Sequence, residues 1–284
     1  MENNIKKVKK KTNPNLVFLE VVLLIVGLLF IYPITLIYLN SVKPFKEIIV
    51  DVIALPKELT LDNFKHVFAA TDFPRLFMNN ILITVISLVG IIFFSSLGAY
   101  VLERSKSKLS KVIFNFCILP MLVPFQTIMI TLVKLMNSLG LANSIIGLSI
   151  QYWGFCTPMA LFIYYSFVKT IPKELDESAM MDGSSTFRTF REIIFPILKP
   201  TTATITILNV MMIWNDFLLP LLMVNSRPET KTLTLAAYSF VGQYSTNWNY
   251  AMAAMVLAVS PSIIFFLLMQ KHIIKGVVDG AVKG

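Results

Sequence analysis

The chain has 284 residues, of which 56% are hydrophobic and only 14% are charged, and its mean hydropathy is +0.71. A soluble domain of this size usually carries about a quarter charged residues, so the composition argues against a water-soluble enzyme. Two cysteines and two histidines exclude a disulfide scaffold and leave few ligands for a metal site. The net charge of +9 in so apolar a chain indicates basic cytoplasmic loops rather than a nucleic-acid partner. The composition predicts a polytopic membrane protein.

Long apolar stretches set the expected fold. A membrane-spanning helix needs about 20 mostly apolar residues, and six stretches meet this requirement. They cover residues 16–39, 79–102, 112–133, 145–168, 201–224 and 251–270. The first is too long for a cleaved signal, whose apolar core has about 7–15 residues. The sequence therefore predicts an all-α protein with six transmembrane helices.

Prolines interrupt several of these stretches. They are Pro33, Pro120, Pro124, Pro158, Pro220 and Pro261. Proline is tolerated within membrane helices where neighbouring groups satisfy the freed backbone. These residues favour kinked or broken helices around a cavity.

Lysine and arginine counts give the orientation. Of the 25 such residues, 17 lie in the N-terminal tail, in 103–111, in 169–200 and in the tail from Lys271, whereas 8 lie in the alternate segments. The positive-inside rule places the first group, with both termini, in the cytoplasm. The expected organisation is a basic tail (1–15), the first helix (16–39), an extracytoplasmic loop (40–75), a transmembrane core (76–270) and a C-terminal tail (271–284). Lys6–Lys11 is expected to anchor its tail on anionic membrane lipid.

Common catalytic motifs are missing from the sequence. No Gly-Lys pair is available for a phosphate-binding P-loop, and neither H-E-x-x-H nor G-x-S-x-G occurs. An intramembrane aspartyl protease needs two carboxylates, but Asp216 is the only aspartate within a predicted span. The energy for any transport must come from an ion gradient or from another subunit.

Segment 169–200 is patterned as two short helices. Pro172 suits the first turn of a helix, and the acidic residues that follow suit its N-terminus. Gly183 offers a left-handed C-cap, and Ser184, Ser185 or Thr186 can cap a second helix. In that second helix Phe187, Phe190 and Ile194 recur at helical spacing. The pattern predicts an amphipathic hairpin that docks on another protein, although an ordinary capped cytoplasmic hairpin is the simpler alternative.

The same segment resembles a known family. Glu177-Ser178-Ala179-x-x-Asp182-Gly183, followed by Phe190, Ile194 and Pro196, resembles the EAA loop in permease subunits of ABC importers. Ser178 stands where the family has a second alanine. The stretch 214–220 (WNDFLLP) resembles a motif of sugar importers, with Asp216 in place of glutamate, and the ending 275–284 resembles the tail of the maltose-type second permease.

The resemblance implies the transmembrane domain of a type I ABC importer in a bacterial cytoplasmic membrane. The expected partners are a second homologous permease, two ATPase subunits and an extracytoplasmic sugar-binding protein. The chain itself would be non-catalytic and would bind no cofactor, because ATP and Mg²⁺ would be bound by the ATPase. The residues carried over as ATPase-docking are Glu177, Ser178, Ala179, Asp182, Gly183, Phe190, Ile194 and Pro196. In the tail, Lys275, Gly280, Lys283 and Gly284 are carried over as ATPase contacts.

A sugar pathway has weaker candidates. Amide side chains bind sugar hydroxyls, so Gln151, Asn209 and Asn215 are candidate lining residues, but such residues also hold membrane helices together. An acid within a span is by default a functional-site hypothesis. Asp216 could equally have a structural partner near the outer interface.

Three other functions remain as alternatives. A stand-alone ion-coupled carrier is expected to show an internal inverted repeat and several intramembrane acids. The predicted spans hold only Asp216 and Glu20, and Glu20 is expected to reach the cytoplasmic interface. An ABC permease for glycerol phosphate is expected to hold an arginine or lysine in its cavity, and none lies within a predicted span. A membrane scaffold would not need the ATPase-docking pattern.

Overall fold

The computed structural model describes residues 14–105, 107–242 and 246–281, with the backbone alone described from 272 onward. The described residues form helices joined by short turns, and within them the only β-type pairing is an isolated bridge between Val241 and Thr246. The all-α prediction is confirmed.

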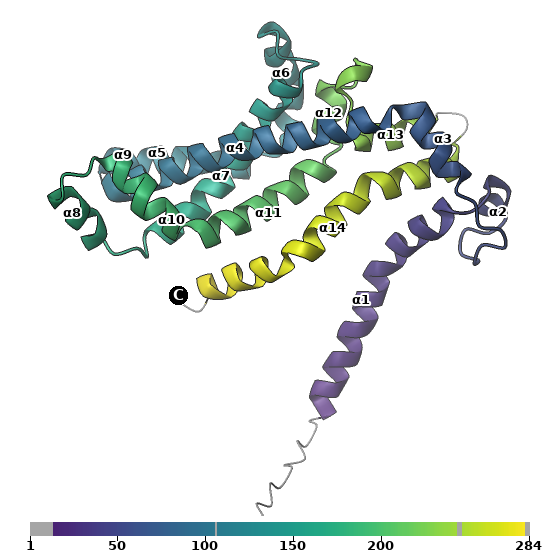
Figure 1. Cartoon of the computed structure of the whole chain (residues 1–284), viewed down its shortest axis with the longest axis horizontal. Helices are drawn as coiled ribbons and strands as arrows, with labels where there is room; N and C mark the ends of the chain where they lie inside the picture. Colours follow the sequence, from purple (N-terminus) through teal and green to yellow (C-terminus); the bar gives the residue numbers. More distant parts are fainter. Residues whose placement is uncertain (1–13, 106, 243–245, 282–284) are drawn as a thin grey trace, which may run out of the picture.

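Four unbroken helices are long and apolar enough to cross a membrane: α1 (Pro14–Ser41), α4 (Phe73–Ser105), α7 (Ile145–Val168) and α14 (Trp248–Ala281), the last meeting this test over Trp248–Lys271. They run roughly along one long axis, except that α1 leans away from the others (Figure 1). The bounds of α7 match the predicted span. Helix α14 continues through Ala281, so most of the segment expected as a separate tail extends the last helix.

The third predicted span is not one straight helix. It consists of α5 (Lys108–Ile118), the short 3₁₀ turn η1 (Leu119–Leu122) and α6 (Phe125–Ser138), with a bend of 103° between the two parts. Pro120 and Pro124 lie at the break. Because proline has no N–H and its ring clashes with the preceding turn, the two residues account for the interruption.

The fifth predicted span is also interrupted. Helix α11 (Lys199–Asn215) ends before Asp216, whose backbone is extended, and α12 (Leu218–Met223) follows. Before α11, α9 (Thr186–Thr189), the π-helical turn η2 (Phe190–Ile194) and α10 (Phe195–Ile197) form one curved stretch that meets α11 at 74°. The four unbroken helices become up to six spans if each bent pair is one span.

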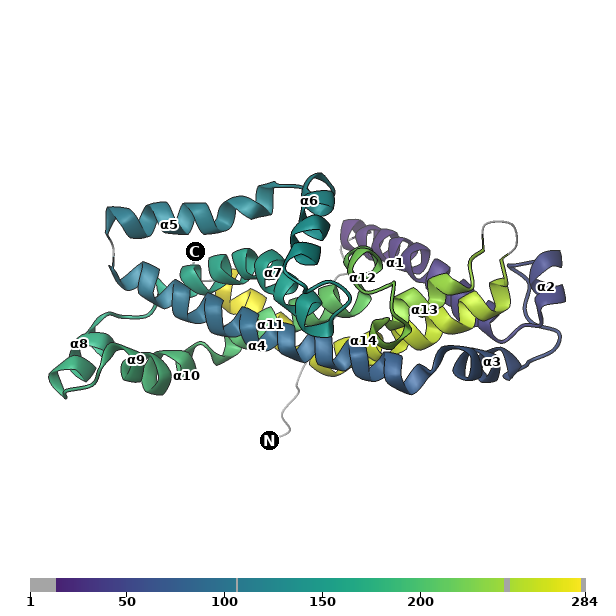
Figure 2. The same cartoon turned by 90° about the horizontal axis from the view of Figure 1, so that it is seen from above.

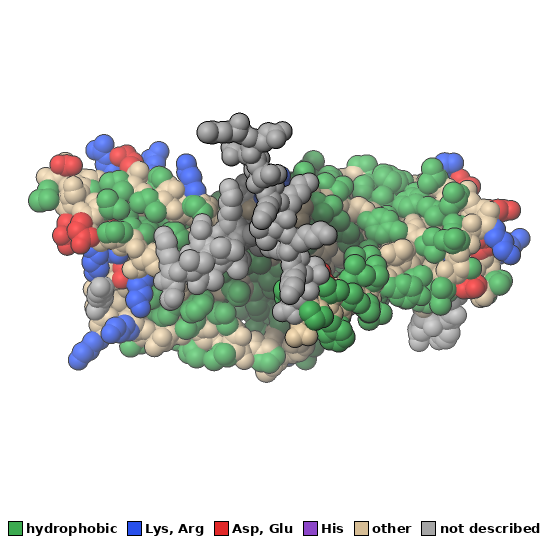
Figure 3. Space-filling model, turned by 90° about the horizontal axis from the view of Figure 1, so that it is seen from below, with side chains coloured by type: hydrophobic (Ala, Val, Ile, Leu, Met, Phe, Trp, Pro, Cys, Tyr) green, Lys and Arg blue, Asp and Glu red, His purple; other side chains and the backbone are tan. Residues whose placement is uncertain are grey.

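Charged side chains gather at the two ends of the elongated molecule, and apolar side chains cover the middle (Figure 3). One end holds α2 (Phe45–Val50), α3 (Asp62–Thr71) and α13 (Leu233–Ser239), and the other end holds α8 (Glu174–Met181), α9 and α10 (Figure 2). The short turn η3 (Pro228–Thr230) lies against α4, where the Asn79 amide donates to the Glu229 carbonyl at 2.8 Å. An apolar belt between two polar ends is the surface that a bilayer requires.

Helices α4 and α7 have the most extensive contact of any pair of described helices. The Trp153 indole on α7 lies over Gly90 on α4 and donates a hydrogen bond to the Ile86 carbonyl at 3.0 Å. A Cβ atom on Gly90 would lie 2.1 Å from the indole ring. Close approach at small residues is a main source of helix association in membranes, and here the glycine makes room for the tryptophan.

A polar cluster closes the end that holds α2 and α3. The Asn63 amide on α3 donates to the carbonyls of Ser41 and Lys43, both at 2.9 Å, and accepts from Asn249 on α14 at 2.8 Å. In the adjoining loop, the backbone N–H groups of Ile53 and Ala54 hold the pKa of the Asp51 carboxyl below its ordinary value. The cluster fixes the end of α1 against α14.

We expect Gly90→Val to destabilise the bundle by about 1–3 kcal/mol, because the added side chain overpacks a filled contact with Trp153. The measurement is the midpoint of thermal unfolding of the purified chain in detergent. Gly27→Val is the matched control, since a Cβ on Gly27 in α1 meets nothing within 4 Å. Equal midpoints for the two variants would contradict the packing argument.

Candidate functional site: a docking hairpin and its buried anchor

Residues 174–197 form the hairpin predicted from the sequence. Helix α8 ends at Met181, and Gly183, two residues later, has a φ of +78°, the left-handed conformation that glycine adopts freely. The Gly183 N–H donates to the Met180 carbonyl at 3.0 Å, and the Ser184 N–H donates to the Ala179 carbonyl at 2.9 Å. These two bonds define a Schellman motif. The turn is therefore fixed by backbone geometry and not by contact with another subunit.

The second arm begins at the expected cap and then departs from a regular helix. The Ser185 hydroxyl accepts a hydrogen bond from the Arg188 N–H at 3.3 Å. The wider π turn at 190–194 is followed by Phe195 and then by Pro196, which has no backbone N–H to donate. π-helical turns are frequent at functional sites, and this one sits within the EAA-like segment.

The predicted apolar stripe divides between two environments. Phe190 and Ile194 are buried in the chain's own core, and the Phe190 ring lies 5.4 Å from that of Tyr100 on α4. Phe187 is exposed. Within this chain the first two side chains hold the hairpin on the bundle, and only Phe187 is open to a partner.

The hairpin exposes large apolar side chains at a charged end of the molecule. Unless a partner covers them, these side chains face water. We define the docking face as four of the exposed apolar residues of the hairpin, all close to its turn, together with two of its exposed acids. The members are Leu175, Met180, Met181, Phe187, Glu177 and Asp182. Met181 is 83% exposed. Exposed apolar groups on an ordered element mark interaction surfaces. Sequence reasoning missed Leu175, Met180 and Met181, although the apolar pair between Ala179 and Asp182 was a visible signal.

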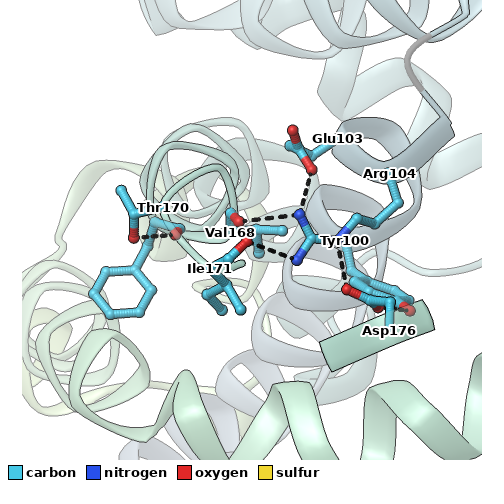
Figure 4. A network of polar contacts seen from close by, with 8 residues as sticks. Tyr100, Glu103, Arg104, Val168, Thr170, Ile171 and Asp176 are labelled. Atoms are coloured by element: carbon cyan, nitrogen blue, oxygen red, sulfur yellow. Dashed lines mark hydrogen bonds and ion pairs between the residues drawn. The ribbon is translucent and has the colours of Figure 1, made fainter. Parts of the chain in front are cut away.

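A buried ion-pair network joins the hairpin to the bundle (Figure 4). Arg104, near the end of α4, pairs with Asp176 of α8 at 2.9 Å and with Glu103 at 2.8 Å. Asp176 also accepts a hydrogen bond from the Tyr100 hydroxyl at 2.6 Å. The three charged side chains are 13%, 8% and 6% exposed in the order Arg104, Asp176, Glu103.

The same guanidinium reaches the end of α7. It donates to the carbonyls of Ile171 at 3.1 Å and Val168 at 3.5 Å. Arg104 therefore touches α4, α7 and α8 at once. A planar guanidinium with five donors is suited to this role. Sequence reasoning treated Asp176 only as a favourable charge at a helix N-terminus and did not find Arg104, since their proximity depends on how three helices meet.

The amide candidates for a sugar path bond mainly to their own helices. Gln151 and Asn209 are buried and donate to the carbonyls of Gly147 and Ile205, four residues earlier. Asn215 is exposed, and its carbonyl oxygen accepts from Ser262 on α14 at 3.0 Å. The Gln151 carbonyl oxygen has no hydrogen-bond partner among the described residues. These contacts place Asn215 at a helix contact and leave Gln151 with a free acceptor.

Asp216 occupies the break between α11 and α12. Its carboxylate accepts the Tyr152 hydroxyl at 2.8 Å and the Leu218 N–H at 3.1 Å, and its carbonyl accepts the Thr234 hydroxyl at 2.9 Å. The residue thus links α7, α12 and α13. The structural partner considered from the sequence is Tyr152.

The candidate tail contacts are only partly placed. Lys275 and Gly280 lie on the backbone of α14, whereas Lys283 and Gly284 lie outside the described residues, as does the basic tail 6–11. Among the described residues, no group of three or more histidine, cysteine, aspartate or glutamate side chains is arranged to hold a metal ion.

Comparisons with known proteins agree with this architecture. Residues 91–279 match the family described as binding-protein-dependent transport system inner membrane component. The chain is 41% identical over 268 residues to the probable starch degradation products transport system permease protein AmyC of Thermoanaerobacterium thermosulfurigenes, covering 94% of this chain and 96% of that protein. It is 38% identical to the multiple sugar-binding transport system permease protein MsmG of Streptococcus mutans, covering 97% and 100%.

A solved structure shares the fold. It is the crystal structure of a bacterial ABC transporter involved in the import of the acidic polysaccharide alginate, with a TM-score of 0.78 and 23% identity over 92% of this chain and 97% of the other. The chain belongs to the family of binding-protein-dependent transport inner membrane components, the permease subunits of ABC importers. It is a multi-pass protein of the cell membrane, and its family is one of transport permeases.

We expect Arg104→Gln to destabilise the chain by about 3–5 kcal/mol, because it leaves two buried carboxylates without their counter-charge. Arg188→Gln is the control, since Arg188 pairs with Glu192 on the exposed surface, where ion pairs contribute little. Thermal unfolding in detergent measures both. A midpoint for Arg104→Gln equal to that for Arg188→Gln would disprove the anchoring role.

Replacing Asp216 by alanine is expected to cost about 1–3 kcal/mol, because the Tyr152 hydroxyl and the Leu218 N–H lose their acceptor. Asn137→Ala on α6 is the comparison, since that side chain is exposed and its amide donates to the Val133 carbonyl of its own helix. The free energies of unfolding in detergent should differ by at least about 1 kcal/mol, and an equal loss in both variants would argue against a structural role for the carboxylate.

Proposed function

We propose that this chain forms one half of the translocation pathway of an ATP-driven importer for a sugar or oligosaccharide. Each of the two relatives reported above is described as a permease for starch degradation products or for multiple sugars, and a third, 36% identical, is a melibiose, raffinose and stachyose import permease of Bacillus subtilis. The proposed partners are a second homologous permease, two ATPase subunits and an extracytoplasmic sugar-binding protein.

The docking face carries the proposal. An ordered hairpin whose docking face places four exposed large apolar side chains beside two carboxylates favours a protein partner that covers them. We place the ATPase there, with Glu177, Ser178 and Asp182 exposed toward it and Gly183 forming the turn. This assignment makes the hairpin end cytoplasmic, in agreement with the lysine and arginine count, and puts both termini on that side.

Coupling follows from the anchor. Arg104 connects α8 to the ends of α4 and α7 through hydrogen bonds and ion pairs that are almost fully buried. A displacement of α8 by the ATPase would therefore move α4 and α7 with it, since sliding would expose unpaired charges in a poorly solvated contact. ATP and Mg²⁺ would be bound by the ATPase, and this chain would supply the moving pathway.

The pathway itself is proposed to run beside the interrupted helices. The break at Asp216 frees backbone polar groups at membrane depth, and such groups are tolerated where they line a cavity or are covered by protein. Gln151, with its free carbonyl oxygen, and Asn209 and Asn215 are the proposed polar contacts on this side.

The decisive test is an affinity pull-down of the chain from gently solubilised membranes of its own host. The wild type should recover a second permease and an ATPase. Glu177→Arg combined with Gly183→Trp should lose the ATPase and reduce sugar uptake by at least about tenfold, because the charge is reversed and a bulky residue enters a left-handed turn. Glu229→Arg, in the turn η3 away from the hairpin, should retain both.

Recovery of the wild-type chain without a second permease or an ATPase would contradict the proposal that it is part of an ATP-driven importer. Gradient-driven flux in liposomes would then test the ion-coupled carrier. Uptake measured across a panel of oligosaccharides and glycerol phosphate would distinguish a carbohydrate permease from a permease for another solute.

A further inference from the structure

Two cavities adjoin each other between α4, α5 and α7. The first, of about 820 Å³, opens at the end where α8 lies, and the second, of about 700 Å³, follows the apolar surface of the same helices. Leu102 lines both. The two cavities meet at this residue, and we call them together the groove, with the first cavity as its polar head and the second as its apolar tail.

The head is basic. Four cationic side chains line it, Arg104, Lys111, Lys169 and Lys173, against two acidic ones, Glu103 and Glu174. Arg104 is already compensated by Glu103 and Asp176. Lys111 on α5 and Lys169 at the end of α7 are exposed, and neither makes an ion pair with a residue that the structure describes. Their ammonium groups leave an excess of positive charge over an open polar cleft.

The tail is almost entirely apolar. Its wall includes aromatic and aliphatic side chains such as Phe94, Phe116, Trp153 and Leu161, and it passes Gly98 and Gly154. A Cβ atom on Gly154 would meet nothing within 4 Å, so the groove is open at that position. The wall belongs mainly to helices of membrane-spanning length, so in a membrane this part of the groove would lie within the depth of the hydrocarbon core.

We propose that this groove is a binding site for an anionic phospholipid, with the headgroup phosphate between Lys111 and Lys169 and one acyl chain along the wall that contains Gly154. The occupant has to be amphipathic because the head of the groove is charged and the tail is not. It has to be anionic because the charge at the head is positive. Basic pockets between membrane helices bind acidic lipid headgroups for this reason.

The site borders the anchor of the docking hairpin. Arg104 and Glu103 line the head of the groove and also hold α8. A bound phosphate would lie beside the buried network at the joint between α4, α7 and α8. Of the functional statements above, the proposal needs only the membrane location, and it does not depend on what covers the docking face.

Native mass spectrometry of the full chain, released from detergent with its co-purifying partners, tests the site. Phosphatidylglycerol and phosphatidylcholine with identical acyl chains are the probes. The wild type should retain one phosphatidylglycerol at least about tenfold more tightly than phosphatidylcholine. Lys111→Gln with Lys169→Gln should remove most of that preference. Lys46→Gln with Lys57→Gln, two exposed lysines at the other end, should leave it unchanged.

A second variant separates the tail from the head. Gly154→Leu should weaken the binding of both lipids by at least about tenfold, because the leucine side chain fills the groove. Gly27→Leu in α1 should leave the binding of both lipids unchanged. Glycerol phosphate and inorganic phosphate should fail to displace phosphatidylglycerol, because neither occupies the apolar part.

Four results would overturn the proposal: equal retention of the two lipids, a preference that survives loss of both lysines, displacement by a soluble phosphate, or retention that is lost whenever partner subunits are bound. The last would assign the groove to a subunit interface. If Gly154→Leu does not fold, the exposed lysine pair still decides the question.

Discussion

The contact on which the rest of the hairpin end depends is the buried guanidinium of Arg104. One side chain forms ion pairs with a carboxylate on α8 and with a neighbouring carboxylate on α4, and it donates hydrogen bonds to two carbonyls at the end of α7. A charge at this depth is tolerated only while every partner is present. The position of the hairpin is therefore set by electrostatics inside the bundle, and its outward face is free to be apolar.

The second constraint is the bilayer. It requires an apolar belt, which the four long helices provide, and it requires that every interrupted helix satisfy its own polar groups. At the α11–α12 break, Asp216 meets this requirement by accepting from Tyr152 and Leu218. The close contact of Gly90 with Trp153 holds α4 against α7, the pair of helices on which both the anchor and the lipid groove are built.

These features place the proposed functions next to one another. The docking face, the anchor and the basic head of the groove all lie at the end where α4 and α7 finish. Force applied to α8 would pass through Arg104 into two helices that cross the membrane, and an anionic lipid would sit against the same joint. Protein partner and membrane would then act on one set of contacts.

Much of this could be predicted from the sequence because it depends on local or one-dimensional properties. Apolar runs of membrane length, the alternation of lysine and arginine, the left-handed turn at Gly183 and the cap at Ser185 each require only neighbouring residues. Pro120 and Pro124 predicted a kinked or broken helix, but they did not predict the bend of 103°.

What only the tertiary structure decided involves residues far apart in the chain. Tyr100 and Asp176 are 76 positions apart, and Tyr152 and Asp216 are 64 apart. Such pairs form because helices cross at particular angles, which no local pattern encodes. The same packing buries Phe190 and Ile194 and leaves Phe187 exposed. The helical spacing of these three residues predicts that they share one face, but it does not say what that face packs against.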